Sequence, residues 1–141
     1  MTYAGDFEKT LADDDWTRLA QYFCDDAVYE VDAPIIGCRL ETTENIFAGI
    51  KKSLDGMDRR FDSRDIDLTS GPERDGDELR ASWTITYHKE GVKPFLLRGR
   101  TEARYRDGRI AYMVDHYDQA ITDESLAWQA ETGVAIDPRY V

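Results

Sequence analysis

The chain has few of the side chains on which most protein metal sites depend. It holds two cysteines, Cys24 and Cys38, and two histidines, His88 and His116. No spacing among these four residues matches a zinc site. Two cysteines cannot build a disulfide framework, and we expect both to remain free thiols in small core positions. The sequence therefore predicts no bound metal ion.

Several catalytic signatures are missing as well. The chain contains no Gly-x-Gly-x-x-Gly, no Walker loop, no Gly-x-Ser-x-Gly and no His-Glu-x-x-His. Nucleotide, serine-hydrolase and zinc-protease sites therefore have no support in the sequence. We expect no cofactor.

Positive charge is scarce, and long apolar runs are absent. Lys and Arg total 18 against 29 Asp and Glu, which gives a formal charge of -11. Such a field repels phosphate and argues against nucleic acid or an anionic membrane as a partner. No apolar run approaches the ~18 residues that cross a bilayer, and residues 1–10 lack the features of a secretory signal. We expect a soluble, cytoplasmic protein.

The chain is predicted to be one domain, 1–141, because no repeat, low-complexity tract or linker divides it. Its N-terminal part combines helical apolar spacing with two short β-rich runs. Thr42 or Thr43 is a candidate cap for the third helix, and Gly56 is a candidate stop. The expected elements are helices over 7–11 and 16–23, strands over 27–32 and 35–40, and a third helix between this cap and Gly56, with its apolar positions from Ile46 to Leu54.

From Phe61 onward the apolar period changes from 3.6 to 2, which indicates strands. The pairs Asp75-Gly76 and Asp107-Gly108 are typical of tight hairpin turns. A last helix is expected over 123–132, with Thr122 as its cap, Gly133 after its end and a tail containing Pro138 beyond. The four predicted strands cover 61–73, 78–90, 94–106 and 109–118.

This order predicts an α+β fold, in which a curved antiparallel sheet is wrapped by three N-terminal helices into a cone with an internal pocket, plus a short C-terminal helix. Two stretches carry a resemblance to a known family: DDWTRLAQYFCDDAVYEVDAP (14–34) and YRDGRIAYMVDHYD (105–118). They resemble the SnoaL-like branch of the nuclear transport factor 2-like superfamily, over about residues 6–120. The superfamily includes ketosteroid isomerases, polyketide cyclases, dehydratases, epoxide hydrolases and non-catalytic binding modules.

Alternation along the long strands separates two faces. The apolar face of 78–90 includes Trp83 and Tyr87, and that of 94–106 includes Leu97. Over 109–118 the residues leave both alternating sets open as the inward face. The resemblance to ketosteroid isomerases favours the inward set Met113, Asp115 and Tyr117.

An inward Asp115 would be surrounded by apolar and aromatic side chains, where desolvation raises a carboxyl pKa. Such a group is suited to general acid or base catalysis, whereas an outward Asp115 would be one more surface acid. Asp32 is a second candidate: the resemblance places it one residue away from the proton-shuttling aspartate of ketosteroid isomerases. It either acts with Asp115 or closes a turn before Pro34.

The resemblance implies a cofactor-independent acid/base enzyme of isomerase, dehydratase or cyclase type that acts on a hydrophobic cyclic small molecule. In that reading Asp115 is the acid/base, Asp32 its partner, and Tyr87 or Tyr117 a donor to an oxyanion. The alternative is a non-catalytic module of the same fold that binds a small ligand or serves assembly. The expected pocket-wall residues are Trp83, Met113, Leu97 and Trp16.

Two departures from family patterns limit the resemblance. The helical tyrosine of the ketosteroid isomerase oxyanion hole corresponds to Phe7, and its protonated aspartate corresponds to a position near Thr101, so a ketosteroid isomerase itself is disfavoured. Scytalone dehydratase, of the same fold, uses two histidines. His88 and His116 lie on the faces we assign as outward, which favours a surface role for both.

The outward face of the long strands is expected to form the interface of a homodimer. Its residues alternate with the apolar set, and arginine predominates on one strand. The surface is large for a chain of this size. It comprises Arg98, Arg100, Arg104, Thr84, Thr86, Tyr112 and Val114.

Overall fold

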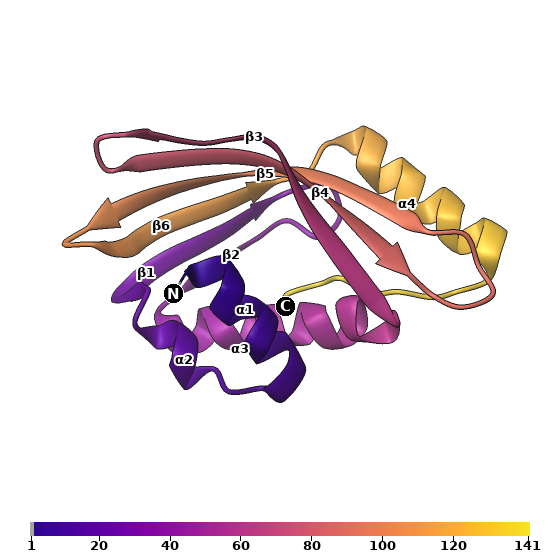
Figure 1. Ribbon diagram of the computed structural model, residues 1–141, viewed down its shortest axis with the longest axis horizontal. Helices are drawn as coiled ribbons and strands as arrows, with labels where there is room; N and C mark the ends of the chain where they lie inside the picture. The colour runs from indigo at the N-terminus through magenta and orange to yellow at the C-terminus, as the bar shows by residue number, and fades with distance from the viewer. Residues whose placement is uncertain (1) are drawn as a thin grey trace.

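The computed structural model describes residues 2–141 and has an α+β architecture, with helices against the concave face of a curved, unclosed sheet (Figure 1). The fold class predicted from the sequence is confirmed. The elements are α1 (Tyr3–Asp13), α2 (Thr17–Ala20), β1 (Phe23–Asp32), β2 (Cys38–Glu41), α3 (Thr43–Gly56), the 3-10 turn η1 (Asp58–Arg60), β3 (Ser63–Asp75), β4 (Glu78–His88), β5 (Phe95–Arg106), β6 (Arg109–His116) and α4 (Gln119–Thr132).

The sheet has the strand order β2-β1-β6-β5-β4-β3. Strands β3 to β6 form an antiparallel meander, whose four members are the long strands expected from the sequence. Strand β1 departs from the expected antiparallel pattern because it runs parallel to β6, with Val31 beside Asp115. This pairing brings the N-terminal strand next to the last one, so side chains about 85 positions apart in sequence become neighbours.

Strand β1 begins earlier than the sequence predicted, because α2 is only one turn long. Phe23 and Cys24, expected at the end of a helix, are the first residues of β1. Phe23 pairs with Ile110 of β6 and is 1% exposed, so pairing within the sheet outweighs the helical spacing of the local sequence. Cys38 pairs with Val31, seven residues along β1 from Cys24, which separates the two thiols too widely for a disulfide.

The expected second strand also shifts, to Cys38–Glu41, because residues 33–37 form a turn. Ile35 lies at the centre of this turn with a φ of 68°, an uncommon conformation for a β-branched residue. The Ile36 N–H donates to the Pro34 carbonyl at 2.7 Å. The turn projects Ile35 outward, where its side chain is 67% exposed.

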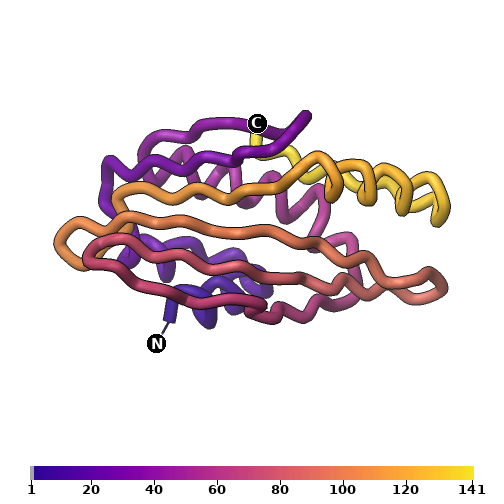
Figure 2. The backbone as a smooth tube through the Cα atoms, turned by 90° about the horizontal axis from the view of Figure 1, so that it is seen from above, coloured from indigo at the N-terminus to yellow at the C-terminus, as the bar shows by residue number. Residues whose placement is uncertain are grey.

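The C-terminal segment differs most from the expectation. Helix α4 starts four residues early, because the Asp118 carboxylate, not Thr122, caps it by accepting the Ile121 N–H at 2.9 Å. Gly133 ends α4 in a left-handed conformation, as predicted. Residues 134–141, which we name the C-terminal tail, then run back beneath the sheet to α3 (Figures 1 and 2).

Gly56, expected to stop the third helix, is the last residue of α3, and Met57 follows it as the C-cap. Its Cα faces the C-terminal tail so closely that a Cβ there would lie 1.8 Å from the Asp137 carbonyl oxygen. The Asp137 N–H donates to the Gly56 carbonyl at 2.9 Å, and the Ser53 hydroxyl donates to the Pro138 carbonyl at 2.7 Å. These contacts fix the tail along α3 and make it a structural part of the fold.

Candidate functional site

A cavity of about 530 Å³ lies between the concave face of the sheet, helices α1, α3 and α4, and the C-terminal tail. Its volume is within the range that holds drug-sized ligands. Its wall is mainly apolar and aromatic, and three exposed apolar side chains, Ile35, Ile66 and Leu126, belong to the lining. These three residues mark the rim of the cavity.

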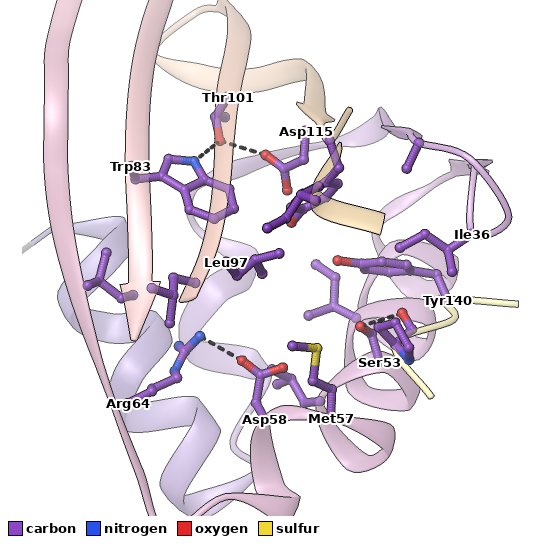
Figure 3. A pocket seen from close by; sticks show the side chains of 18 of the residues that line it. Ile36, Ser53, Met57, Asp58, Arg64, Trp83, Leu97, Thr101, Asp115 and Tyr140 are labelled. Carbon is purple, nitrogen blue, oxygen red and sulfur yellow. Dashed lines mark hydrogen bonds and ion pairs between the residues drawn. The ribbon is translucent and has the colours of Figure 1, made fainter. Parts of the chain in front are cut away.

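Asp115 of β6 belongs to the wall of this cavity and is held by two hydroxyl groups (Figure 3). The Tyr29 hydroxyl, from the adjacent parallel strand β1, donates to Oδ2 at 2.5 Å. The Thr101 hydroxyl, from β5 on the other side, donates to Oδ1 at 2.6 Å and accepts the Trp83 Nε1–H at 2.9 Å. Hydroxyl groups from β1 and β5, the strands on either side of β6, therefore fix the orientation of the Asp115 carboxyl group.

Burial raises the pKa of Asp115 above its ordinary value near 3.8, while the hydrogen bonds from Thr101 and Tyr29 oppose the shift. Across residues 2–141, no ion pair joins Asp115 to a lysine, arginine or histidine. Neutral donors alone compensate poorly for lost hydration of a charge. The arrangement therefore favours a carboxyl that holds its proton to higher pH than a surface aspartate.

Two further tyrosines surround this carboxyl. The Tyr117 ring packs edge-on against Trp83, with centroids 5.7 Å apart, and the Tyr140 ring packs in the same manner against Tyr29. The Tyr140 hydroxyl lies 3.5 Å from that of Tyr29. Burial raises the pKa of Tyr140 to about 12 and that of Tyr117 well above 10, so both are neutral hydrogen-bond donors at physiological pH.

A second polar group lies in the cavity wall at a distance from Asp115 (Figure 3). Asp58 of η1 accepts hydrogen bonds from Arg64 Nη1 at 2.8 Å and from the Tyr87 hydroxyl at 3.0 Å, both at Oδ2. Arg64 Nη2 donates to Glu8 Oε1 of α1 at 2.5 Å. Burial raises the pKa of Asp58, and the Arg64 guanidinium opposes that shift. Asp58, Arg64, Tyr87 and Glu8 are named the Asp58 cluster.

Most of the residues predicted from the sequence line the cavity. The inward assignment of alternate residues on β4, β5 and β6 agrees with the lining. The hydroxyl of Tyr87, one of the two expected oxyanion donors, donates to Asp58 in this structure. The predicted residues in the lining are Asp115, Tyr87, Tyr117, Trp83, Met113 and Leu97.

Trp16 is not part of the cavity wall. Its ring packs against Phe47 of α3, with centroids 5.5 Å apart, and its Nε1–H donates to Asp14. The residue precedes the single turn of α2 and packs against the apolar core. Its role is packing between α2 and α3.

Asp32 lies outside the cavity, contrary to the expected pairing with Asp115. In the parallel register Asp32 is next to His116, and Val31 is next to Asp115, so Asp32 faces the outer side of the sheet. Its carboxylate is 70% exposed and lies 2.7 Å from His116 Nδ1. His116 Nε2 also lies 3.3 Å from Glu102, so the ring is placed between two acids on the outer side of the sheet and does not line the cavity.

We expect Asp32→Asn to change the activity of the protein by no more than about twofold, because the substituted group does not face the cavity. Turnover of the same substrate by the variant and the parent measures this. A loss of tenfold or more would return Asp32 to the catalytic machinery. The chemical shifts of the His116 ring, measured by NMR at one pH, provide an independent readout of the altered contact between residues 32 and 116.

Sequence reasoning missed three of the groups that surround Asp115: Tyr29, Thr101 and Tyr140. The alternation of Ala27, Tyr29 and Val31 was a usable signal, since all three are buried on one face of β1. Nothing local marked Tyr140, which reaches the cavity only because the C-terminal tail docks on α3.

No family model matches the sequence, and no curated protein matches it. Solved structures do match. A protein of ketosteroid isomerase-like fold from Catenulispora acidiphila, in complex with trimethylamine, has a TM-score of 0.62 and 21% identity over 94% of this chain and 92% of that chain. The M. tuberculosis LEH-like epoxide hydrolase has a TM-score of 0.62 and 16% identity, covering 91% and 90%.

A proposed polyketide cyclase from Pseudomonas putida has a TM-score of 0.56 and 14% identity, covering 85% of this chain and 92% of that one. The chain has the nuclear transport factor 2-like fold. At these identities the likeness concerns the fold, which supports several chemistries.

The described part of the chain, residues 2–141, has no helix long and apolar enough to span a bilayer. In the same residues, no cluster of three or more histidine, cysteine or acidic side chains is placed to hold a metal ion.

Proposed function

We propose that the protein is a cofactor-independent acid/base enzyme that acts on a hydrophobic cyclic small molecule. The observation that carries the proposal is Asp115, a carboxyl in the wall of an apolar cavity whose hydrogen-bond partners are the neutral hydroxyls of Tyr29 and Thr101. Perturbed carboxyls in clefts are frequent acid/base catalysts. The fold neighbours include an epoxide hydrolase and a proposed cyclase, which supports an enzyme of this general type.

In this proposal Asp115 exchanges a proton with the ligand. As a carboxylate it takes a proton from a carbon next to a carbonyl. The C–H electron pair forms a C=C bond, and the π pair of the carbonyl moves to its oxygen, which gives an enolate. As an acid it returns the proton to another carbon or to a departing hydroxyl, which completes an isomerisation or an elimination. Each Asp115 oxygen accepts one hydrogen bond and retains a second lone pair for this transfer.

Tyr117 is proposed as the donor to the developing oxyanion. Among residues 2–141 its hydroxyl has no hydrogen-bond partner, although it lines the cavity and neighbours Trp83. Burial keeps the phenol neutral and hence a donor. A donor preorganised toward the oxyanion stabilises the transition state more than the neutral carbonyl.

The test is exchange of α-hydrogens for deuterium. Cyclohexanone, 2-decalone and a steroid 3-ketone are incubated in D₂O with the protein, and NMR follows the loss of each α-proton signal. We expect catalysed exchange for at least one ketone, with the bicyclic or larger ring fitting best because the cavity of about 530 Å³ is apolar.

A ketone that binds, as shown by saturation-transfer NMR, without exchanging faster than in buffer would contradict the proposal. That outcome would favour a non-catalytic module that holds a small ligand. The trimethylamine complex of the Catenulispora acidiphila protein shows that a protein of this fold accommodates a small molecule.

A further inference from the structure

The Asp58 cluster places charge inside an otherwise apolar part of the cavity wall. The side chains of Arg64 and Asp58 are only 7% and 8% exposed. Breaking water contacts with two ions is costly, and a hydrophobic pair of similar volume is often as stable. The apolar neighbours Met57 and Leu97 show that this wall readily accepts hydrophobic residues (Figure 3). Stability alone therefore gives no reason for the pair.

The charge balance of the cluster indicates which ligand group it can recognise. Two carboxylates, Asp58 and Glu8, flank the single guanidinium of Arg64. Arg64 directs one nitrogen to each of them, and its Nε is buried without a hydrogen-bond partner in the described residues. The guanidinium is thus committed to the protein, and the excess negative charge disfavours a carboxylate or phosphate.

An acceptor is available at Asp58. The hydrogen bonds that Asp58 receives from other side chains of residues 2–141 both end on Oδ2. Its other oxygen points away from Arg64 and toward Met57, which also lines the cavity (Figure 3). A hydroxyl or N–H group on a ligand could donate a hydrogen bond to this second oxygen of Asp58 without disturbing the bonds from Arg64 and Tyr87.

We propose that the Asp58 cluster is a second binding subsite, which accepts a hydrogen-bond donor at the far end of an elongated apolar ligand whose reacting end lies at Asp115. The inference rests on the proposed function for the position of the reacting end. It defines the ligand class as a rigid, hydrophobic ring system with a polar group at each end, and the far group is a hydroxyl or its N–H equivalent.

Rigid phenols test this subsite by affinity and without turnover. The probes are 4-hydroxybiphenyl with 4,4′-dihydroxybiphenyl, and 2-naphthol with 2,6-dihydroxynaphthalene, titrated by calorimetry or by quenching of tryptophan fluorescence. We expect the dihydroxy compound of at least one pair to bind about tenfold more tightly than the monohydroxy one, as befits one hydrogen bond to a charged group. A carboxylate in place of the second hydroxyl should remove the preference.

The decisive variant replaces the ion pair as a unit. Asp58→Leu/Arg64→Met removes both charges together, which avoids an unpaired buried ion and should leave the fold intact. It should reduce the dihydroxy preference to about twofold or less, and Asp58→Asn should act in the same direction. The matched control is Asp67→Asn, which should keep the preference because Asp67 is an exposed residue of β3 outside the cavity lining.

The outcomes separate this inference from the proposed function. The subsite is overturned if neither dihydroxy compound is preferred by the parent protein, if the double variant keeps the preference, or if the carboxylate probe binds most tightly. Deuterium exchange that needs Asp115 but is accompanied by no dihydroxy preference would leave the enzyme proposal standing and refute the subsite. A preference for the dihydroxy compound without any catalysed deuterium exchange would support the subsite and contradict the enzyme proposal.

Discussion

Asp115→Asn is expected to lose about 10²- to 10⁴-fold in rate on any substrate that the cavity turns over, the usual contribution of a positioned acid/base group. Asparagine has nearly the same shape and can still bind Tyr29 and Thr101, but it neither accepts nor delivers the proton. The loss should appear mainly in kcat, because the apolar wall that binds the ligand is unchanged. Steady-state kinetics or the deuterium-exchange rate measures it.

The same variant should be as stable as the parent or more stable at neutral pH. Because the folded-state pKa of Asp115 is raised, the native state binds more protons than the unfolded state above the ordinary value near 3.8. The free energy of unfolding therefore falls as pH rises through the window between the ordinary and the raised pKa. Asp115→Asn removes this penalty, so its stability should depend less on pH across that window.

Thermal melting at several pH values distinguishes a catalytic from a structural Asp115. Lost activity with an unchanged or higher Tm supports the acid/base role. Lost activity with a lower Tm would mean that the carboxylate is a structural acceptor for Tyr29 and Thr101. Asp67→Asn provides the matched control, since Asp67 is an exposed aspartate of β3 and its substitution should change neither quantity.

The inward face of the meander was accessible to sequence reasoning because a two-residue period is a local property. Trp83, Leu97 and Met113 lie on the apolar set of their strands, and each lines the cavity. For β6 the two sets were equally apolar, and only the family resemblance favoured the one with Asp115. The fold and the central carboxyl are thus predictable from the amino-acid sequence together with that resemblance.

The partners of Asp115 depend on pairings that the local sequence does not encode. Tyr29 reaches the carboxyl because β1 lies parallel to β6. Hairpin turns in the sequence predict pairing between consecutive strands, and they do not predict the pairing of β1 with β6. The same register decides against Asp32: moving one residue along a strand transfers a side chain to the opposite face of the sheet. A sequence alignment one residue out of step therefore changes a pocket acid into a surface acid.

The Asp58 cluster escaped notice for a related reason. Asp58 and Arg64 lie at the junction between α3 and β3, where neither period applies, and the residues that separate them are polar except for Phe61. Charged residues in such a segment are usually solvated. Tertiary contacts bury them here: Arg64 of β3 bridges from Asp58 to Glu8 of α1. The Tyr87 hydroxyl of β4 also donates to Asp58.

Gly56→Ala is expected to lower the free energy of unfolding by about 1–3 kcal/mol, although alanine favours a helix over glycine. The added methyl would lie 1.8 Å from the Asp137 carbonyl oxygen, a backbone atom that has no rotamer with which to move aside. Relief requires the C-terminal tail to shift from α3. That shift breaks the bonds that join the tail to Gly56 and Ser53 and withdraws Tyr140 from the cavity.

Compared with the parent protein, Gly56→Ala should have a Tm lower by about 3–10 °C, and a carboxypeptidase should release Val141 and Tyr140 from it faster. Gly5→Ala is the matched control: this glycine is also helical, but its Cβ would meet only the Thr2 hydroxyl, at 3.1 Å. Truncation after Gly133 completes the test, because the alanine should destabilise the full chain and not the truncated one. Equal effects in both chains would place the strain within α3, and the tail would then be independent of Gly56.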